Sequence, residues 1–432
     1  MNASDFTRRV AHIILDLQEQ KQKQPERFIV SDVVDGKGLQ YVDLVQEGGG
    51  VMGIALVGYI YVLEQMGIRF FSLAGTSAGS INTALLAALG GPDKEKCAKI
   101  LEILATQDFS EFVDGGDDAR QLMESLLSRN RLRKWINVTF GILRNLDEIF
   151  FQKGLNPGSV FQEWLQSTTG SVKLGETRRR MNDFPNLYLR KKQGNVPFNN
   201  PQAKLAIVAT DITTETKVVF PEMAELYYAQ PDEELLADIV RASMSLPIFF
   251  DPVQLDISQL RLLRDDYVQK WRTMARYYGE LPDKVMLVDG GVMSNFPIDI
   301  FHDRTRVPTR PTFGVKLGID RINTRNINSM AALFMSCFDG ARNIRDFEFL
   351  KNNDDFKHLV AYVDTKGFNW LDFQISDERK KELFVRGAEA AKEFLEGFNW
   401  EEYKYVREQL IRAHFAEFKS NQFDGTGRAK AA

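Results

Sequence analysis

Hydrophobic and polar positions between residues 39 and 91 fall into two repeating patterns. Short apolar runs at 39–45 and 68–74 have the length of buried strands. A glycine-rich turn follows each run, and an apolar segment of helical length, 54–66 or 81–89, follows each turn. Both of these segments stop at glycine, which adopts positive φ at little cost. The pattern predicts a strand, a glycine loop, a helix, a second strand, a turn and a second helix.

The second turn contains a candidate nucleophile. Gly75-Thr76-Ser77-Ala78-Gly79 fits G-x-S-x-G, in which a sharp strand-to-helix turn exposes a serine. The small residues leave room for that turn, and the amides of the following helix favour a developing negative charge. A serine could stand in such a turn by chance, but the strand, the helix and the upstream glycine loop favour the elbow. We therefore expect Ser77 to be the nucleophile.

The first turn has two interpretations. Gly48, Gly50 and Gly53 match the dinucleotide fingerprint G-x-G-x-x-G. That motif requires an acidic residue at the end of the second strand, and residues 73–77 contain none. We therefore expect an oxyanion hole formed by the backbone amides of this loop, at Gly48, Gly49, Gly50 and Gly53.

The candidate base is a carboxylate. Asp289 follows the buried-strand run 285–288 and precedes Gly290 and Gly291, which allow a tight turn at the strand's end. Serine is more often paired with histidine. None of the four histidines lies in a glycine-rich or strand-end context; they are His12, His302, His358 and His414. A triad through His302 or His358 remains the alternative.

These motifs resemble those of the patatin-like phospholipase family. The resemblance rests on 48–53, 75–79 and 289–291, supported by 241–252 and by the segment Ala209-Thr210-Asp211. It implies an α/β, three-layer patatin-like fold with a mostly parallel central sheet, helices on both faces and helical insertions. It also implies a Ser77–Asp289 dyad whose turns are shaped by glycine at four positions: Gly75, Gly79, Gly290 and Gly291.

The function implied by the resemblance is release of fatty acid from phospholipid or related acyl esters through an acyl-enzyme. An acyl thioesterase or acyltransferase would use the same dyad, and a catalytically silent lipid- or partner-binding module is the alternative from another class. Many members carry Arg or Lys where this chain has Met52, and Asp or Ser where it has Glu47. No cluster of His, Cys or carboxylates has ligand spacing, so we expect neither a metal nor a cofactor.

Composition and charge narrow the class and the compartment. The 432 residues are 44% hydrophobic, and the net charge of −4 gives no indication of nucleic-acid binding. Two cysteines, Cys97 and Cys337, fit a reducing compartment. With no signal peptide and no transmembrane segment evident, we expect a cytoplasmic protein that contacts membranes peripherally.

The expected organisation is one catalytic domain with additions at both ends. It comprises an amphipathic helix and lead-in at 1–38, a catalytic domain at 39–397 with insertions at about 92–200 and 253–283, and a helix and tail at 398–432.

Four segments each have two interpretations. The helix within 1–27 docks on the protein or binds a surface, and the basic loop 173–200 is solvated or attracts anionic headgroups. The insertion 256–279 packs or forms a lid, and the aromatic loop 368–373 belongs to the core or to a membrane interface.

Overall fold

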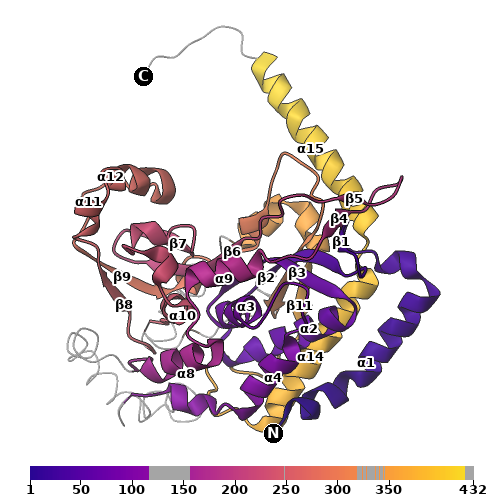
Figure 1. Cartoon of the computed structure of the whole chain (residues 1–432), viewed down its shortest axis with the longest axis horizontal. Coiled ribbons are helices and arrows are strands. Elements are labelled where there is room, and N and C mark those ends of the chain that lie inside the picture. Colours follow the sequence, from indigo (N-terminus) through magenta and orange to yellow (C-terminus); the bar gives the residue numbers. More distant parts are fainter. Residues whose placement is uncertain are drawn as a thin grey trace.

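The computed structural model describes residues 1–115, 156–247, 249–318 and 346–423, with five isolated positions between 319 and 345. A large sheet runs through the molecule, and helices surround it (Figure 1). Residues 116–155 of the first predicted insertion, and Cys337, lie outside the described residues.

The middle of the sheet is parallel. In spatial order its strands are β11 (Val360–Val363), β10 (Thr312–Leu317), β2 (Gln40–Gln46), β3 (Ile68–Thr76) and β6 (Leu205–Asp211). Strands β2, β3 and β6 are buried along their whole length, as expected for parallel strands covered on both faces. The prediction of an α/β fold with a mostly parallel central sheet is confirmed.

Antiparallel strands extend the sheet on both sides. Beside β6 these are β7 (Thr216–Phe220), β9 (Lys284–Asp289) and β8 (Val253–Asp256); beside β2 they are β1 (Val33–Asp35), β4 (Leu187–Leu189) and β5 (Val196–Pro197).

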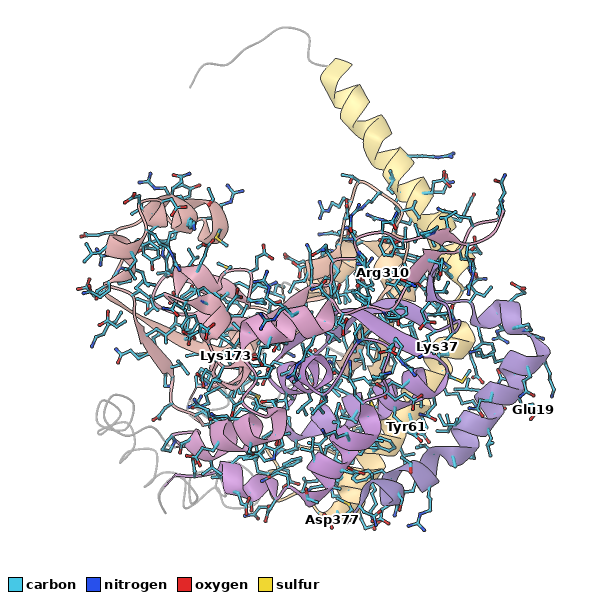
Figure 2. All side chains as sticks on the ribbon, viewed as in Figure 1. Glu19, Lys37, Tyr61, Lys173, Arg310 and Asp377 are labelled. Carbon is cyan, nitrogen blue, oxygen red and sulfur yellow. The ribbon has the colours of Figure 1, made fainter. Side chains whose placement is uncertain are left out.

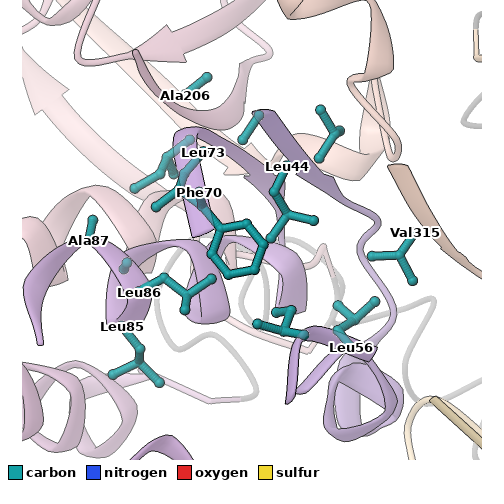
Figure 3. Close-up of a cluster of buried hydrophobic side chains, with 14 of the residues drawn as sticks. Leu44, Leu56, Phe70, Leu73, Leu85, Leu86, Ala87, Ala206 and Val315 are labelled. Carbon is teal, nitrogen blue, oxygen red and sulfur yellow. The ribbon is translucent and has the colours of Figure 1, made fainter. Parts of the chain in front are cut away.

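Helices supply the rest of the fold. They are α1 (Ala3–Lys23), α2 (Gly53–Gln65), α3 (Ala78–Ala88), α4 (Cys97–Thr106), α8 (Ser159–Thr169), α9 (Leu174–Met181), α10 (Leu236–Ser243), α11 (Leu260–Leu263), α12 (Tyr267–Lys270), α14 (Asp377–Gly397) and α15 (Trp400–Phe423). Helices α2 and α3 pack against the parallel strands, and α14 packs along α2. Apolar side chains from these strands and helices form the core in Figure 3, including Leu44, Leu56, Phe70, Leu73, Leu85, Leu86 and Val315.

Helix α1 docks on the protein's own body. Its apolar stripe is buried, and the Phe6 ring meets that of Phe384 on α14 with centroids 5.4 Å apart. Polar residues such as Glu19 face outward (Figure 2). Docking, the first of the two interpretations of this segment, is therefore confirmed. None of the helices in the described ranges is both long and apolar enough to cross a membrane.

The insertion 256–279 lies far from the carboxyl end of β9. Strands β8 and β9 form an antiparallel pair in which Asp256 faces Lys284, at the opposite end of β9 from Asp289. The insertion is anchored there because the Tyr267 hydroxyl donates to the Leu226 carbonyl at 2.6 Å. These contacts support packing as the role of the insertion, and a lid over Ser77 stays a prediction.

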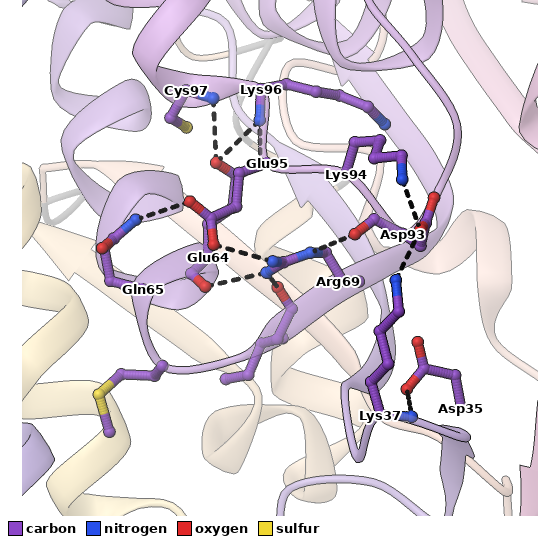
Figure 4. A network of polar contacts seen from close by, with 12 residues as sticks. Asp35, Lys37, Glu64, Gln65, Arg69, Asp93, Lys94, Glu95, Lys96 and Cys97 are labelled. Carbon is purple, nitrogen blue, oxygen red and sulfur yellow. Dashed lines mark hydrogen bonds and ion pairs between the residues drawn. The ribbon is translucent and has the colours of Figure 1, made fainter.

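A buried polar network ties α2, β3 and α4 together at the end of α2 farthest from its glycine loop (Figure 4). The Glu64 carboxylate accepts the amides of Lys96 and Cys97 at the start of α4. Arg69 donates to the Glu64 carbonyl at 2.9 Å and pairs with Glu95 at 3.0 Å. These polar groups supply one another's hydrogen-bond partners, and the Cys97 thiol is buried. We therefore assign the network a structural role.

Candidate active site

Ser77 occupies a strained turn between β3 and α3. Its φ of 51° and ψ of −124° lie outside the regions that L-residues favour, a conformation that costs about 1–3 kcal/mol. Neighbouring glycines make the turn possible. A Cβ at Gly75 would lie 2.3 Å from the Gly79 carbonyl oxygen, and one at Gly79 would lie 2.4 Å from that of Gln46.

The end of α10 and the residue after it contact Ser77 directly. The Ser77 amide donates to the Ser243 hydroxyl at 3.1 Å, and that hydroxyl donates to the Val208 carbonyl at 2.6 Å. The Ser77 hydroxyl lies 3.5 Å from the Met244 sulfur. The sequence motifs did not indicate these contacts, which lie in the segment 241–252.

Ser77 follows the end of β3, and Asp289 is the last residue of β9; the ends of these two strands meet beside β6. Strand β7 occupies one edge of β6 over residues 207–211. Strands β3 and β9 pair with parts of the same stretch, so both must use the other edge. Thr76 lies opposite Val208, and Asp289 lies opposite Ala209, the next residue of β6. The elbow and the Asp289 turn are thus neighbours in space although they are far apart in sequence.

The Asp289 side chain is buried, with 3% of its surface exposed. One carboxylate oxygen accepts the Gly291 amide at 2.7 Å, and the Asp289 amide donates to the Ser245 carbonyl at 2.8 Å. A Cβ at Gly290 would lie 2.1 Å from the Val208 carbonyl oxygen, so the turn can pass this close to β6 only with glycine there.

The glycine loop presents two amides rather than four. The Gly48 amide donates to the Asn295 carbonyl at 3.0 Å, and the Gly53 amide donates to the Gly50 carbonyl. The amides of Gly49 and Gly50 have no acceptor among the described residues. The Gly48 and Gly53 amides are thus engaged within the protein, which argues against an oxyanion role for these two, and the role of the Gly49 and Gly50 amides stays a prediction.

Residues 294–296 join the three loops. The Thr76 hydroxyl donates to the Ser294 carbonyl at 3.0 Å, and the Asn295 side chain donates to the Gly48 carbonyl at 3.1 Å. The Phe296 amide donates to the Asp346 carboxylate at 2.7 Å, and burial raises the pKa of that carboxyl to about 7. Sequence analysis missed these residues, although they stand only five to seven positions after Asp289.

An apolar pocket opens beside Ser77. It is narrow, with about 50 Å³ of space open to a water molecule. Gly50, Ala78 and Met244 line it near Ser77, and aromatic side chains line the rest: Phe109, Phe112, Phe161, Trp164, Phe250 and Phe373. Its apolar and aromatic lining suits a hydrocarbon chain.

The alternative histidine base lies in an aromatic cluster. The His302 ring meets those of Phe349 and Phe356, with centroids 5.3 and 4.8 Å away. Burial lowers its pKa to about 4, and its Nε2 has no hydrogen-bond partner among the described residues. No contact between Ser77 and either His302 or His358 is present in the described part of the chain.

Comparison with known proteins decides the family. The sequence model of the patatin-like phospholipase family matches residues 44–302. The chain belongs to this family. Patatin-like phospholipases are hydrolases of lipid esters, and the matched range contains the elbow, the glycine loop and the Asp289 turn.

Two individual proteins are also similar. The uncharacterized protein YqhO of Bacillus subtilis is 26% identical over 364 residues, which cover 83% of this chain and all of that protein. The structure of VipD from Legionella pneumophila aligns with a TM-score of 0.39 and 15% identity, covering 85% of this chain and 70% of that one.

Proposed function

We propose that this patatin-like protein hydrolyses acyl esters of lipids with Ser77 as nucleophile and Asp289 as general base. The observation that carries the proposal is the meeting of β3 and β9 along one edge of β6, since the two residues lie at these strand ends. The apolar pocket beside Ser77 supports a fatty acyl group as the part of the substrate that is bound.

The reaction then has two steps. The Ser77 oxygen attacks the acyl carbonyl carbon while Asp289 takes the hydroxyl proton, and the resulting oxyanion accepts the Gly49 and Gly50 amides. Asp289 returns the proton to the leaving alcohol as the acyl-enzyme forms. Water attacks the acyl-enzyme with Asp289 again taking the proton, and fatty acid leaves as Ser77 is reprotonated.

The test measures fatty-acid release from phospholipid, diacylglycerol and an acyl thioester by wild type, Ser77→Ala and Asp289→Asn. We expect wild type to be active and both variants to lose at least about 10³-fold in kcat while remaining folded. A fluorophosphonate should label wild type but not Ser77→Ala. The matched control is Ser80→Ala, whose hydroxyl donates to the Ser77 carbonyl at 2.6 Å and which should still be labelled.

The panel separates the alternatives. Preferred cleavage of the thioester, or transfer of the acyl group to an added alcohol, would identify a thioesterase or an acyltransferase with the same dyad. Undiminished hydrolysis by Ser77→Ala would refute the mechanism. Absence of both turnover and labelling in wild type would favour a binding module.

A further inference from the structure

A buried ion pair lies directly behind the glycine loop. The Lys316 ammonium is 3.0 Å from the Glu47 carboxylate, and the two side chains are 2% and 5% exposed. Glu47 precedes Gly48, and Lys316 lies on β10, beyond the range matched by the family model.

Glu47 gathers several donors at this point. Besides Lys316 it accepts the Asn295 side-chain amide at 3.2 Å and the Leu317 backbone amide at 2.6 Å. The same Asn295 amide donates to the Gly48 carbonyl at 3.1 Å, and the Asn295 carbonyl accepts the Gly48 amide at 3.0 Å. Gly48 is therefore held on both sides, one residue before the amides assigned to the oxyanion.

The positive charge of Lys316 also affects the electrostatics of the glycine loop. A buried carboxylate next to the loop would oppose the negative charge that develops on the substrate, because electrostatic interactions are strong where water is excluded. Lys316 neutralises that carboxylate while leaving it able to accept its hydrogen bonds. A buried ion pair is also a weak source of stability compared with apolar side chains, so stability alone does not account for this one.

We propose that the Glu47–Lys316 pair positions the oxyanion loop, acting through Asn295 and Gly48 on the amides of Gly49 and Gly50. The proposal rests on the proposed function, since it gives those amides their role. Both residues are positioning residues, because neither touches the nucleophile.

A second buried pair provides a matched control. Arg407 of α15 and Asp355 lie 3.3 Å apart, with side chains 5% and 0% exposed. Arg407 also donates to the Asp303 carbonyl, and no contact of this pair with the three catalytic loops is present among the described residues. Removing Arg407 thus leaves a buried carboxylate without its cation at a site remote from the loop.

The experiment compares Lys316→Met with Arg407→Met and with the doubly neutral variant Glu47→Gln/Lys316→Met. Hydrogen–deuterium exchange of the Gly48 and Val51 amides, both hydrogen-bonded in the wild type, reports the order of the loop. We expect at least tenfold faster exchange there in Lys316→Met and no change in Arg407→Met. In kinetics we expect a tenfold or larger loss of kcat with little change in KM in Lys316→Met. The double variant should lose less, because it keeps an acceptor for the Asn295 and Leu317 amides and leaves no unpaired charge.

Equal effects of Lys316→Met and Arg407→Met on loop exchange, or no effect of either, would overturn the inference. The exchange measurement requires no turnover, so it decides the matter even if the proposed hydrolysis fails. If Lys316→Met does not fold, the double variant is compared with Arg407→Met instead, and its kcat should then stay within tenfold of wild type. Ser77-dependent hydrolysis with an unaltered loop in Lys316→Met would refute positioning while leaving the proposed function intact.

Discussion

At the scale of single residues, the backbone conformation of Ser77 depends on the residues next to it in the sequence. Its positive φ is possible because Gly75 and Gly79 bring backbone atoms within distances that no side chain allows. The G-x-S-x-G pattern predicts this turn because it consists of adjacent residues. The Met244 and Asn295 contacts come from distant segments whose meeting depends on strand pairing, so no local pattern predicts them.

Gly50 offers a test of the oxyanion loop. A Cβ there would lie 2.0 Å from the Trp370 carbonyl oxygen, and its φ is +53°. We expect Gly50→Ala to displace the loop and lower kcat by about 10²-fold or more.

The control is Gly38→Ala, at a φ of +83° with no atom near the added Cβ. It should cost only about 1–2 kcal/mol of stability and leave kcat unchanged. Equal losses of kcat in the two variants would contradict the argument from the Trp370 contact.

Asp346 should make stability depend on pH. Burial raises its pKa from 3.8 to about 7, so between these values the folded protein holds a proton that the unfolded chain releases. The contribution of this group to the free energy of unfolding therefore falls as pH rises from about 4 to about 7, by up to about 1.4 kcal/mol per unit.

Urea unfolding of wild type and Asp346→Asn across this range provides the measurement. The difference between their free energies of unfolding should grow in favour of the variant as pH rises towards about 7, and then level off. A difference that does not vary with pH would show that the carboxyl does not titrate in this interval.

At the scale of elements, the two sides of α1 have opposite roles. Leu17 is fully buried, whereas Leu15 is 66% exposed. We expect Leu17→Ala to lower the free energy of unfolding by about 2–3 kcal/mol. Leu15→Ala should change it by less than about 0.5 kcal/mol. Denaturant unfolding measures both, and similar values would contradict the docking of this helix.

Helix α8 forms one wall of the apolar pocket. Trp164→Ala should enlarge the pocket and raise kcat/KM for long acyl chains relative to short ones, by about 0.8 kcal/mol for each methylene newly buried. Competition between hexadecanoyl and octanoyl esters measures the ratio of their kcat/KM values. The control is Tyr278→Ala on the insertion, where the ring is 68% exposed, and the ratio should not move. An unchanged ratio in Trp164→Ala would argue against this pocket as the acyl site.

Helices with a clear apolar periodicity could be predicted from the sequence. Short strands that pair with residues far away in the sequence could not. The apolar stripe of α1 predicts its buried face, which the structure confirms. The expected loop 173–200 instead contains α9, β4 and β5. Within it Arg180 donates to the Ala88 carbonyl at the end of α3, and Arg178 forms an exposed ion pair with Asp232; composition does not reveal these contacts.

At the scale of the whole molecule, the catalytic unit extends past the range matched by the family model. Strand β10 pairs with β2 inside the sheet, α14 covers α2, and the Trp370 carbonyl accepts the Val51 amide at 3.1 Å. The motifs gave the fold class and the candidate dyad. They could not show that later residues contact the candidate site, because these contacts are made through the backbone and a buried ion pair.

A chain ending at residue 302 should therefore fail to fold. It would expose the β2 edge and the apolar side of α2, and unpaired strand edges favour aggregation. A chain ending at Phe423 keeps every described element and should remain soluble and monodisperse in size-exclusion chromatography. Soluble, cooperatively unfolding protein from the shorter chain would show that the matched range is a domain by itself.

Pairing with β6 sets the positions of Ser77 and Asp289, the candidate dyad, relative to each other. Both β3 and β9 pair with it in a fixed register. A slip of β9 by one residue would move Asp289 by about 3.3 Å and turn its side chain to the other face of the sheet. The opposite end of β9, at Lys284, lies five residues from Asp289, and the insertion leads into the strand there. We therefore expect a fluorescent label at position 262 of the insertion, where Leu262 is 80% exposed, to leave the position of Asp289 unchanged.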